Sequence, residues 1–167
     1  ISTIQMRKQR RRVIHQMDLL IIDEVSMVRA DLLDAIDTLL RHIRYRPNTP
    51  FGGVQLLLIG DLFQLAPIIK ESEWKLLKPH YKGIYFFHSK AFQQLNILHL
   101  ELNKIFRQQD KTFIQILNKV RNNQLTTQEL QTVNQRYQTK FKHKEKNYHN
   151  NLTTHNAKQD EINNQKM

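Results

Sequence analysis

The first clear hydrophobic pattern along the chain is an unbroken aliphatic run, Leu19–Ile22, that ends in two adjacent carboxylates, Asp23 and Glu24. A strand with one solvated face alternates apolar and polar residues, whereas a strand covered on both faces is apolar throughout. The run therefore predicts a short strand buried on both faces. The acidic pair directly after it places charge at the carboxyl end of that strand.

A helix and a second strand are predicted next. Residues 32–43 carry leucine and isoleucine at helical spacing, with aspartates early, arginines late and Pro47 as a stop. Residues 54–59 read as another buried strand, which ends at Gly60 and Asp61. Strand, helix and strand with polar strand ends predict an α/β fold with a parallel sheet. Such sheets bind ligands at the carboxyl ends of their strands, so the acidic residues are expected to face a ligand.

The middle of the chain continues the mixed pattern. Residues 85–87 are expected to form a short strand, and Ser89 is a plausible cap for a helix through residue 95. Residues 97–102 alternate leucine with polar residues, which predicts a half-buried strand. Residues 113–120 have the apolar spacing of another helix.

The last part of the chain is less apolar. Thr126 and Glu129 have the spacing of a capping box and predict the start of a further helix. Residues 138–151 are polar and rich in lysine, so they are expected to form a linker or an exposed loop. Residues 152–154 could begin a new strand, followed by a helix from about residue 157.

Composition limits the class of protein. The 167 residues include 26 lysines and arginines against 15 acidic residues, a net charge of +11, which fits a nucleic-acid partner or simply a basic surface. The dense basic cluster of residues 7–12 is better explained as a solvated helix face than as a phosphate contact. There is no cysteine, which excludes disulfides and thiolate metal sites. The apolar runs are too short to span a bilayer, so no membrane partner is expected.

Two strand ends could carry phosphate chemistry. An aliphatic strand ending in Asp23 and Glu24 suits a nucleotide triphosphatase, in which one carboxylate holds Mg²⁺ and the other orients or deprotonates the attacking water. In GDLFQLAP, Asp61 could join the polar network around the metal and Gln64 could reach a γ-phosphate or its water. The alternatives are a solvated strand end and a simple strand-to-loop turn. Two such turns on neighbouring strands favour the functional interpretation.

A third candidate is Arg107, in LNKIFRQQD, which is expected between a strand and a helix. An arginine there could stabilise a transferring phosphate, as arginine fingers do. Taken alone, in so basic a chain, a surface arginine is the better interpretation.

Five segments in this order carry a family resemblance: LLIIDEVSMVRADLLDAID, FGGVQLLLIGDLFQLAP, YFFHSKAF, LELNKIFRQQDKTFIQILNKVRNN and NLTTHNAKQDEIN. Together they resemble the PIF-type branch of the RecD-related DNA helicases of superfamily one. The resemblance implies two RecA-like lobes that hydrolyse ATP in the cleft between them while moving 5′ to 3′ on single-stranded DNA. It also implies ATP and Mg²⁺ as cofactors and single-stranded and forked DNA as partners, and such a substrate indicates an intracellular location. The oligomeric state stays unknown, with a monomer favoured.

The resemblance also implies roles for individual residues. Asp23 would coordinate Mg²⁺ through water, Glu24 would be the catalytic base, and Gln64 would sense the γ-phosphate. Arg107 would be the arginine finger with Gln108 beside it. Ser26 and Asp61 would support the nucleotide site. The DNA backbone would be contacted by Thr153, Thr154 and Asn156.

Two departures from the family pattern affect what the chain should do. Where the family commonly has Gln-Leu-Pro-Pro-Val, this chain has QLAPI from Gln64 onward. None of the four glycines forms the G-x-x-x-x-G-K-[ST] loop that holds ATP phosphates. We therefore expect the latter part of a first lobe over residues 1–137, a basic linker over 138–151 and the start of a second lobe over 152–167. Alone, such a chain should be inactive; the alternative is a nucleic-acid-binding remnant without turnover.

Overall fold

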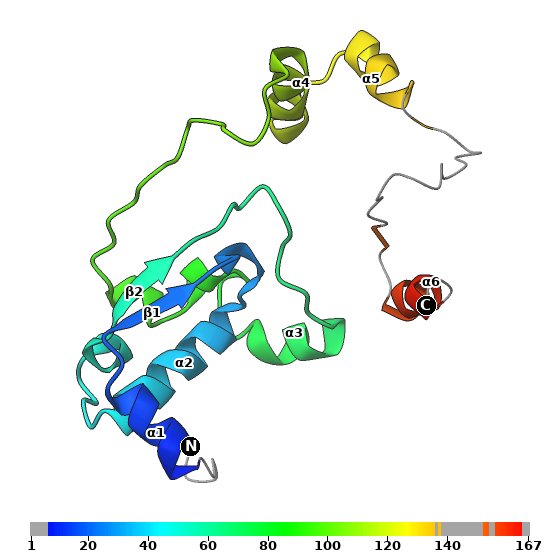
Figure 1. Ribbon diagram of the computed structural model, residues 1–167. Coiled ribbons are helices and arrows are strands. Elements are labelled where there is room, and N and C mark those ends of the chain that lie inside the picture. The colour runs from blue at the N-terminus through cyan, green and yellow to red at the C-terminus, as the bar shows by residue number, and fades with distance from the viewer. Residues whose placement is uncertain (1–6, 136, 138–151, 154–155, 165–167) are drawn as a thin grey trace. The chain divides into compact units, whose positions relative to one another are not determined.

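The computed structural model describes residues 7–135, 137, 152–153 and 156–164. It divides into two compact units, Ile1–Ile105 and Phe106–Met167, which we treat separately. In the first unit, strands β1 (Leu19–Ile22) and β2 (Gln55–Leu58) pair in parallel (Figure 1), with Leu19 opposite Gln55 and Ile22 opposite Leu58. This confirms the predicted strands and the parallel α/β arrangement. The predicted division into lobes is a separate matter and stays a prediction.

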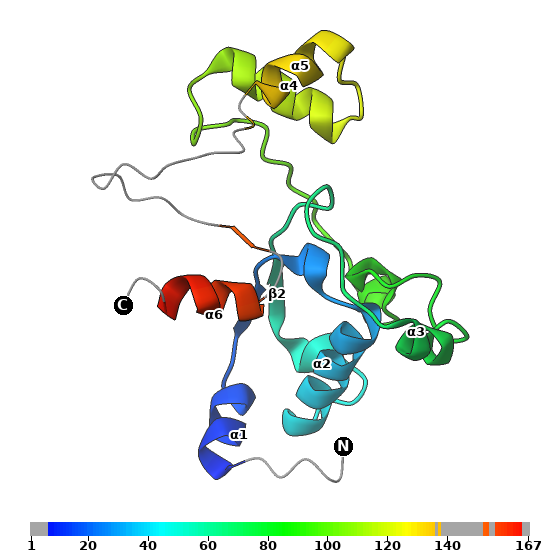
Figure 2. The same ribbon diagram turned by 90° about the vertical axis from the view of Figure 1, so that its right-hand side faces the viewer.

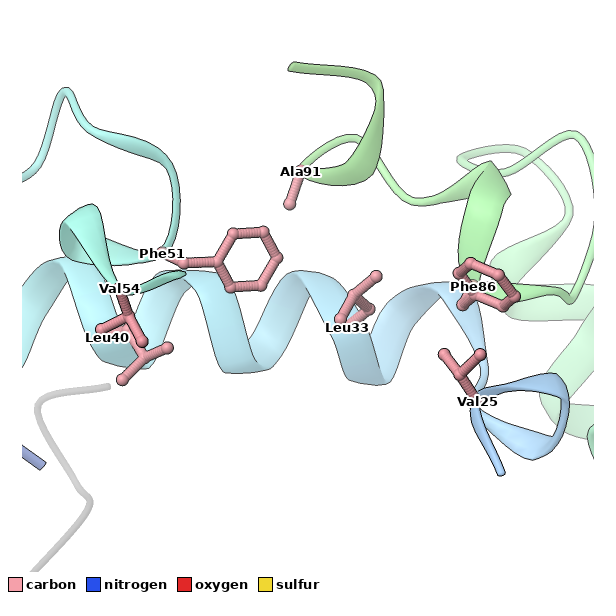
Figure 3. Packing of buried hydrophobic residues seen from close by; sticks show 7 residues of the cluster. All are labelled: Val25, Leu33, Leu40, Phe51, Val54, Phe86 and Ala91. Atoms are coloured by element: carbon pink, nitrogen blue, oxygen red, sulfur yellow. The ribbon is translucent and has the colours of Figure 1, made fainter. Parts of the chain in front are cut away.

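Helix α2 (Ala30–Ile43) connects β1 to β2 and contributes residues to the hydrophobic core. Its buried positions include Leu33 and Leu40, and the apolar cluster follows one side of the helix (Figure 3). The predicted helix is confirmed; within its apolar set Leu33 is fully buried, whereas Leu32 is 51% exposed. The full buried cluster consists of Val25, Leu33, Leu40, Phe51, Val54, Phe86 and Ala91.

The sheet is covered on one face in the part of the chain that the structure describes. Leu20 and Ile22 of β1, with their partners on β2, pack against the core cluster. On the other face Ile21 is 54% exposed and Leu57, its partner in the register, 45%. The expectation of a strand buried on both faces is therefore wrong for the described chain. The apolar run indicates that both faces of β1 are hydrophobic, but the described residues pack against only one of them.

A buried aspartate ties α2 to the turn before β2. The carboxylate of Asp37 accepts a hydrogen bond from the backbone N–H of Phe51 at 2.6 Å and a bifurcated one from the Nε–H of Arg41, at 2.9 Å to Oδ1 and 2.8 Å to Oδ2. This turn, η2 (Pro50–Gly53), is a 3₁₀ segment in which Phe51 and Gly52 have positive φ. A Cβ on Gly52 would lie 2.7 Å from the carbonyl oxygen of Leu40, so a glycine is required there.

We expect Asp37→Ala to lower the free energy of unfolding by about 3 kcal/mol, because it leaves the buried N–H of Phe51 without its acceptor and removes the carboxylate that pairs with the largely buried Arg41. Asp37→Asn should lower the free energy of unfolding by less, since the amide oxygen of the asparagine can still accept a hydrogen bond from the N–H of Phe51. Urea denaturation followed by the fluorescence of Trp74 measures the change. Thr38→Ala, at the exposed neighbouring position, is the control. An Asp37→Ala midpoint equal to that of the control would contradict the assignment.

Polar residues of the first turns of α2 hold the segments that follow β2. The guanidinium of Arg29 bonds Asp31 at 2.7 Å and Glu73 of helix α3 (Glu71–Leu77) at 3.0 Å. The hydrogen bond from Arg29 lowers the pKa of Asp31 below its usual value. Burial and a hydrogen bond to Asp34 raise the pKa of Tyr81 to about 12. Asp34 also accepts from the backbone N–H groups of residues 90 and 91.

Two of the predicted strands are absent from the described chain. Residues 86–88 form a 3₁₀ turn, η3 (Phe86–His88), and Tyr85 makes a single antiparallel bridge to Arg29. Ser89 does cap the next turn by accepting from the N–H of Phe92, but that turn, η4 (Phe92–Gln94), is a short 3₁₀ segment instead of the predicted helix. Residues 97–102 are irregular and exposed. Their alternation has no described strand to pair with, and an unpaired strand leaves its backbone groups unsatisfied.

Helix α1 (Lys8–His15) packs against α2, and the two views place α1 and α3 near opposite ends of α2 (Figure 1 and Figure 2). Ile14 contacts the core cluster. The guanidinium of Arg44 donates to the carbonyl oxygens of His15 at 2.8 Å and Met17 at 2.6 Å. These contacts fix α1 to the first unit.

The second unit contains helices α4 (Lys111–Arg121), α5 (Thr127–Asn134) and α6 (Asn156–Asn164). The predicted capping box is present, with Glu129 and Thr126 bonded to each other's backbone N–H. A hydrogen bond from Lys119, followed by those from Thr126, lowers the pKa of Glu129 to about 2. The predicted helix near residue 157 is confirmed. Residues 152 and 153 are not in a strand, and the predicted linker 138–151 lies outside the described residues.

Candidate active site

Two backbone hydrogen bonds join the carboxyl ends of β1 and β2. The N–H of Ile59 donates to the carbonyl oxygen of Ile22 at 2.9 Å, and the N–H of Val25 donates to the carbonyl oxygen of Ile59 at 2.9 Å. The chain after β1 therefore folds over the end of β2 before it enters α2. The turn that follows β1 and the turn that follows β2 are adjacent at one edge of the sheet, as the strand ends predicted.

The acidic turn after β1 has an unusual backbone. Glu24 is in the left-handed region, with φ of 52° and ψ of 42°, and its N–H donates to the Oδ1 of Asp23 at 2.9 Å. The 3₁₀ turn η1 (Val25–Met27) follows at once and buries Val25. A left-handed glutamate costs about 1 kcal/mol, and such strain gathers at functional turns. Both carboxylates are exposed, and the turn directs the chain away from β1 within one residue.

Gly60 lies against this acidic turn. A Cβ at Gly60 would be 3.0 Å from the backbone nitrogen of Val25 and 3.2 Å from that of Ser26. Its φ is not positive. A glycine is needed here because it lets the ends of β1 and β2 approach closely.

Asp61 and Gln64 form one hydrogen-bonded turn after β2. The Nε2 of Gln64 donates to the Oδ2 of Asp61 at 3.2 Å, and the backbone N–H of Gln64 donates to the carbonyl oxygen of Asp61 at 3.0 Å. The Oδ1 of Asp61 accepts from the N–H of Phe63. Asp61 thus orients the Gln64 side chain, whose amide oxygen has no partner among the described residues. The side chain of Gln64 is exposed.

The hydroxyl of Ser26 is buried, with 1% of the residue exposed, and has no hydrogen-bond partner in the described part of the chain. A buried hydroxyl normally has a partner, so this atom is unusual. No described carboxylate bonds to it, and its predicted support of the nucleotide site stays a prediction.

Arg107 and Gln108 belong to the second unit, whereas the acidic residues and Gln64 belong to the first. Arg107 is exposed and has no described protein partner. The amide oxygen of Gln108 accepts from the N–H of Gln109 at 2.9 Å and of Asp110 at 3.0 Å, and Asp110 caps α4. The predicted helix after Arg107 is confirmed as α4, whereas the predicted strand before it is not present. Gln108 shapes the turn that leads from Arg107 into this helix.

The three candidate DNA contacts are at the start of the last segment. Thr153 is half-buried, and Asn156 is the first residue of α6 and exposed. Thr154 lies outside the described residues. Their roles stay predictions.

Residues 1–131 match the family model described as PIF1-like helicase. The chain belongs to this family. The match confirms the resemblance that the motifs around Asp23, Gln64 and Arg107 indicated.

Similar proteins support the assignment. Over 133 residues the chain is 38% identical to the ATP-dependent DNA helicase RRM3 of Saccharomyces cerevisiae, a match that covers 80% of this chain and 17% of RRM3. A Pif1 helicase from Bacteroides, solved in complex with ADP-AlF3 and ssDNA, is 40% identical with a TM-score of 0.88, over 98% of this chain and 38% of that one. A structure of two coordinating Pif1 helicases at forked dsDNA is also 40% identical, with a TM-score of 0.85, over 97% and 38%.

These likenesses identify the fold as part of a RecA-like lobe, with β1, α2 and β2 as its strand–helix–strand unit. The chain spans less than a fifth of RRM3 and well under half of each solved Pif1 chain. No helix among the described residues is long and apolar enough to cross a membrane.

The donor set at the acidic turn fits Mg²⁺. This ion is usually held by one or two carboxylates together with water and phosphate oxygens, so it does not need a cage made of protein ligands alone. The described residues contain no group of three possible metal ligands. The exposed carboxylates of Asp23 and Glu24 supply what a Mg²⁺–nucleotide complex would require.

Proposed function

We propose that this chain is a segment of an ATP-dependent DNA helicase that couples ATP hydrolysis to 5′-to-3′ movement on single-stranded DNA and to unwinding of forked duplexes. The observation that carries the proposal is the joined ends of β1 and β2. The bond from Val25 to Ile59 joins the turn that carries the carboxylate pair to the end of the strand after which Asp61 and Gln64 follow. Phosphoryl transfer needs such groups placed around a nucleotide.

The residues divide the work as follows. Asp23 would hold Mg²⁺ through water, and the bound ion would neutralise charge on the phosphates. Glu24 accepts the proton of the attacking water. Gln64, held by Asp61, contacts the γ-phosphate and so reports whether ATP or ADP is bound.

The second unit supplies the other groups. Arg107 reaches the transferring phosphate, and Gln108 fixes the turn that presents it. Thr153, Thr154 and Asn156 contact the DNA backbone. Single-stranded and forked DNA are the proposed partners because similar Pif1 structures are described with ssDNA and at forked dsDNA.

Turnover of ATP by the complete polypeptide, with and without single-stranded DNA, tests the proposal. Hydrolysis that DNA stimulates supports a motor. DNA binding without hydrolysis would instead indicate a binding protein that has lost its activity. We expect these 167 residues alone to give no turnover, because they lack the glycine-rich loop that holds the phosphates.

A further inference from the structure

A basic surface lies on α1, at the end of the first unit away from the acidic turn (Figure 1). The chain from residue 7 to residue 17 contains five arginines and lysines and no acidic residue. Lys8, Arg11, Arg12 and His15 recur at the i, i+3, i+4 and i+7 positions of one helix face, and all four are exposed. We call these four residues the α1 stripe.

The α1 stripe has no acidic partner among the described residues. The ion pairs of the first unit involve other cations, on α2, on α3 and before α2. Like charges at i, i+3 and i+4 spacing repel one another and destabilise a helix. A solvated helix normally intersperses acidic residues to relieve this repulsion. The stripe lacks that relief within the protein, and a bound polyanion would supply it.

The α1 stripe is held rigidly. Ile14 packs on the core, and Arg44 donates to the carbonyl oxygen of His15, the last residue of α1. No carboxylate among the described residues pairs with Arg44, so its charge adds to the same corner. Cations on a fixed helix lose less conformational freedom on binding than cations on a loose segment.

An exposed aromatic ring stands beside the stripe. Tyr45 is 71% exposed and has a positive φ of 56°, which is unusual for a bulky residue. The Nη2 of Arg11 donates to its hydroxyl at 2.8 Å, and the guanidinium carbon lies 5.7 Å from the ring centre. The ring of His15 is 6.3 Å away. An exposed ring among cations is the combination by which proteins bind single-stranded nucleic acids.

We propose that the α1 stripe and Tyr45 form a second contact for a nucleic-acid strand, separate from the candidate active site. Lys8, Arg11 and Arg12 would bind the phosphates, and the exposed ring of Tyr45 would stack on a base. The ring favours nucleic acid over an acidic peptide, because carboxylates do not need a stacking surface. This inference does not depend on ATP hydrolysis, so it can fail or succeed independently of the proposed function.

The test is binding of a fluorescent oligo(dT) of about 20 nucleotides, a length that exceeds a typical single-strand site. Anisotropy is measured between about 50 and about 200 mM salt. We expect Lys8→Gln/Arg11→Gln/Arg12→Gln to weaken binding about tenfold or more at the lower salt. The slope of log affinity against log salt should fall by about 2, since three phosphate contacts are lost.

The matched control is Lys75→Gln/Lys78→Gln/Lys82→Gln, which changes the net charge equally on exposed positions in and after α3. Its affinity for oligo(dT) should fall by less than about threefold, because scattered surface charge contributes only to the long-range electrostatic field. Equal losses in the two triple variants, or no loss in either, would overturn the proposal. Thermal unfolding of each variant checks the fold, and the same pair of variants in the complete polypeptide repeats the comparison there.

Tyr45 separates nucleic acid from other polyanions. Tyr45→Leu should weaken oligo(dT) binding about fivefold or more without changing the salt slope, and Tyr45→Phe should keep most of the affinity. Unchanged binding by Tyr45→Leu would overturn the role of the ring. Competition by polyglutamate as strong as that by unlabelled oligo(dT) would assign the surface to an acidic protein and overturn the nucleic-acid assignment.

Discussion

Glu24→Gln in the complete polypeptide should remove DNA-stimulated ATP hydrolysis and leave nucleotide binding intact. The substitution keeps the length and shape of the side chain but removes its capacity to take a proton. General bases contribute about 10²- to 10⁴-fold to rate, so a loss of at least about a hundredfold is expected. The neutral amide still fits the exposed left-handed position, because neither the turn geometry nor the bond from its N–H to Asp23 uses the carboxylate.

Phosphate release with single-stranded DNA present measures the first effect, and binding of a fluorescent ATP analogue measures the second. Glu71→Gln, at an exposed acidic position in α3, serves as the control and should keep full turnover. Turnover by Glu24→Gln at the level of this control would remove Glu24 from the base role. A loss of nucleotide binding would point to a direct part in holding the nucleotide instead.

The sequence predicted those elements whose signals are local. Helix α2 has a long apolar period with acidic residues early and arginines late, and the box of Thr126 and Glu129 marks the start of α5 without any distant partner. The parallel pairing of β1 with β2 followed from strand–helix–strand order. In each case the determining residues are neighbours in the chain or on one face of one helix.

The failures came where a partner decides the structure. Residues 97–102 alternate like a strand, but alternation describes a half-buried surface and does not supply the neighbour that a strand must bond. Residues 85–87 are apolar because Phe86 fills the core, which a 3₁₀ turn achieves as well as a strand. The exposed face of β1 shows the same limit, since the sequence reports that a face is apolar and not what covers it.

The residue types of the candidate site were predicted from the sequence, but its backbone geometry was not. The carboxylates and Gln64 could be recognised from residue type and strand ends. The left-handed backbone of Glu24 and the bond from Val25 to Ile59 had no sequence signal, because they depend on how two turns meet. Gly60 did give a signal, and its function as a close-approach residue becomes visible only when both strand ends are placed.

Arg107→Ala should lower DNA-stimulated turnover by about 10³- to 10⁵-fold, the range known for arginine fingers, with little change in DNA affinity. Arg107 suits this role because it is exposed, and its guanidinium has no partner among the described residues. The bonds from Gln109 and Asp110 to Gln108 hold the turn beside it. Arg107→Lys should not restore the rate, since an ammonium group lacks the planar fork that binds two phosphate oxygens.

The comparison that decides this role uses Lys111→Ala, which removes a positive charge from the first residue of α4, four positions away. It should leave turnover within about twofold, because a solvent-exposed charge that does not touch the phosphate acts through screened, long-range attraction alone. If Arg107→Ala weakens DNA binding and spares the rate at saturating DNA, Arg107 is a DNA contact and not a finger. If it acts on the rate, combining it with Glu24→Gln should add little further loss, because groups that serve one transition state are not additive.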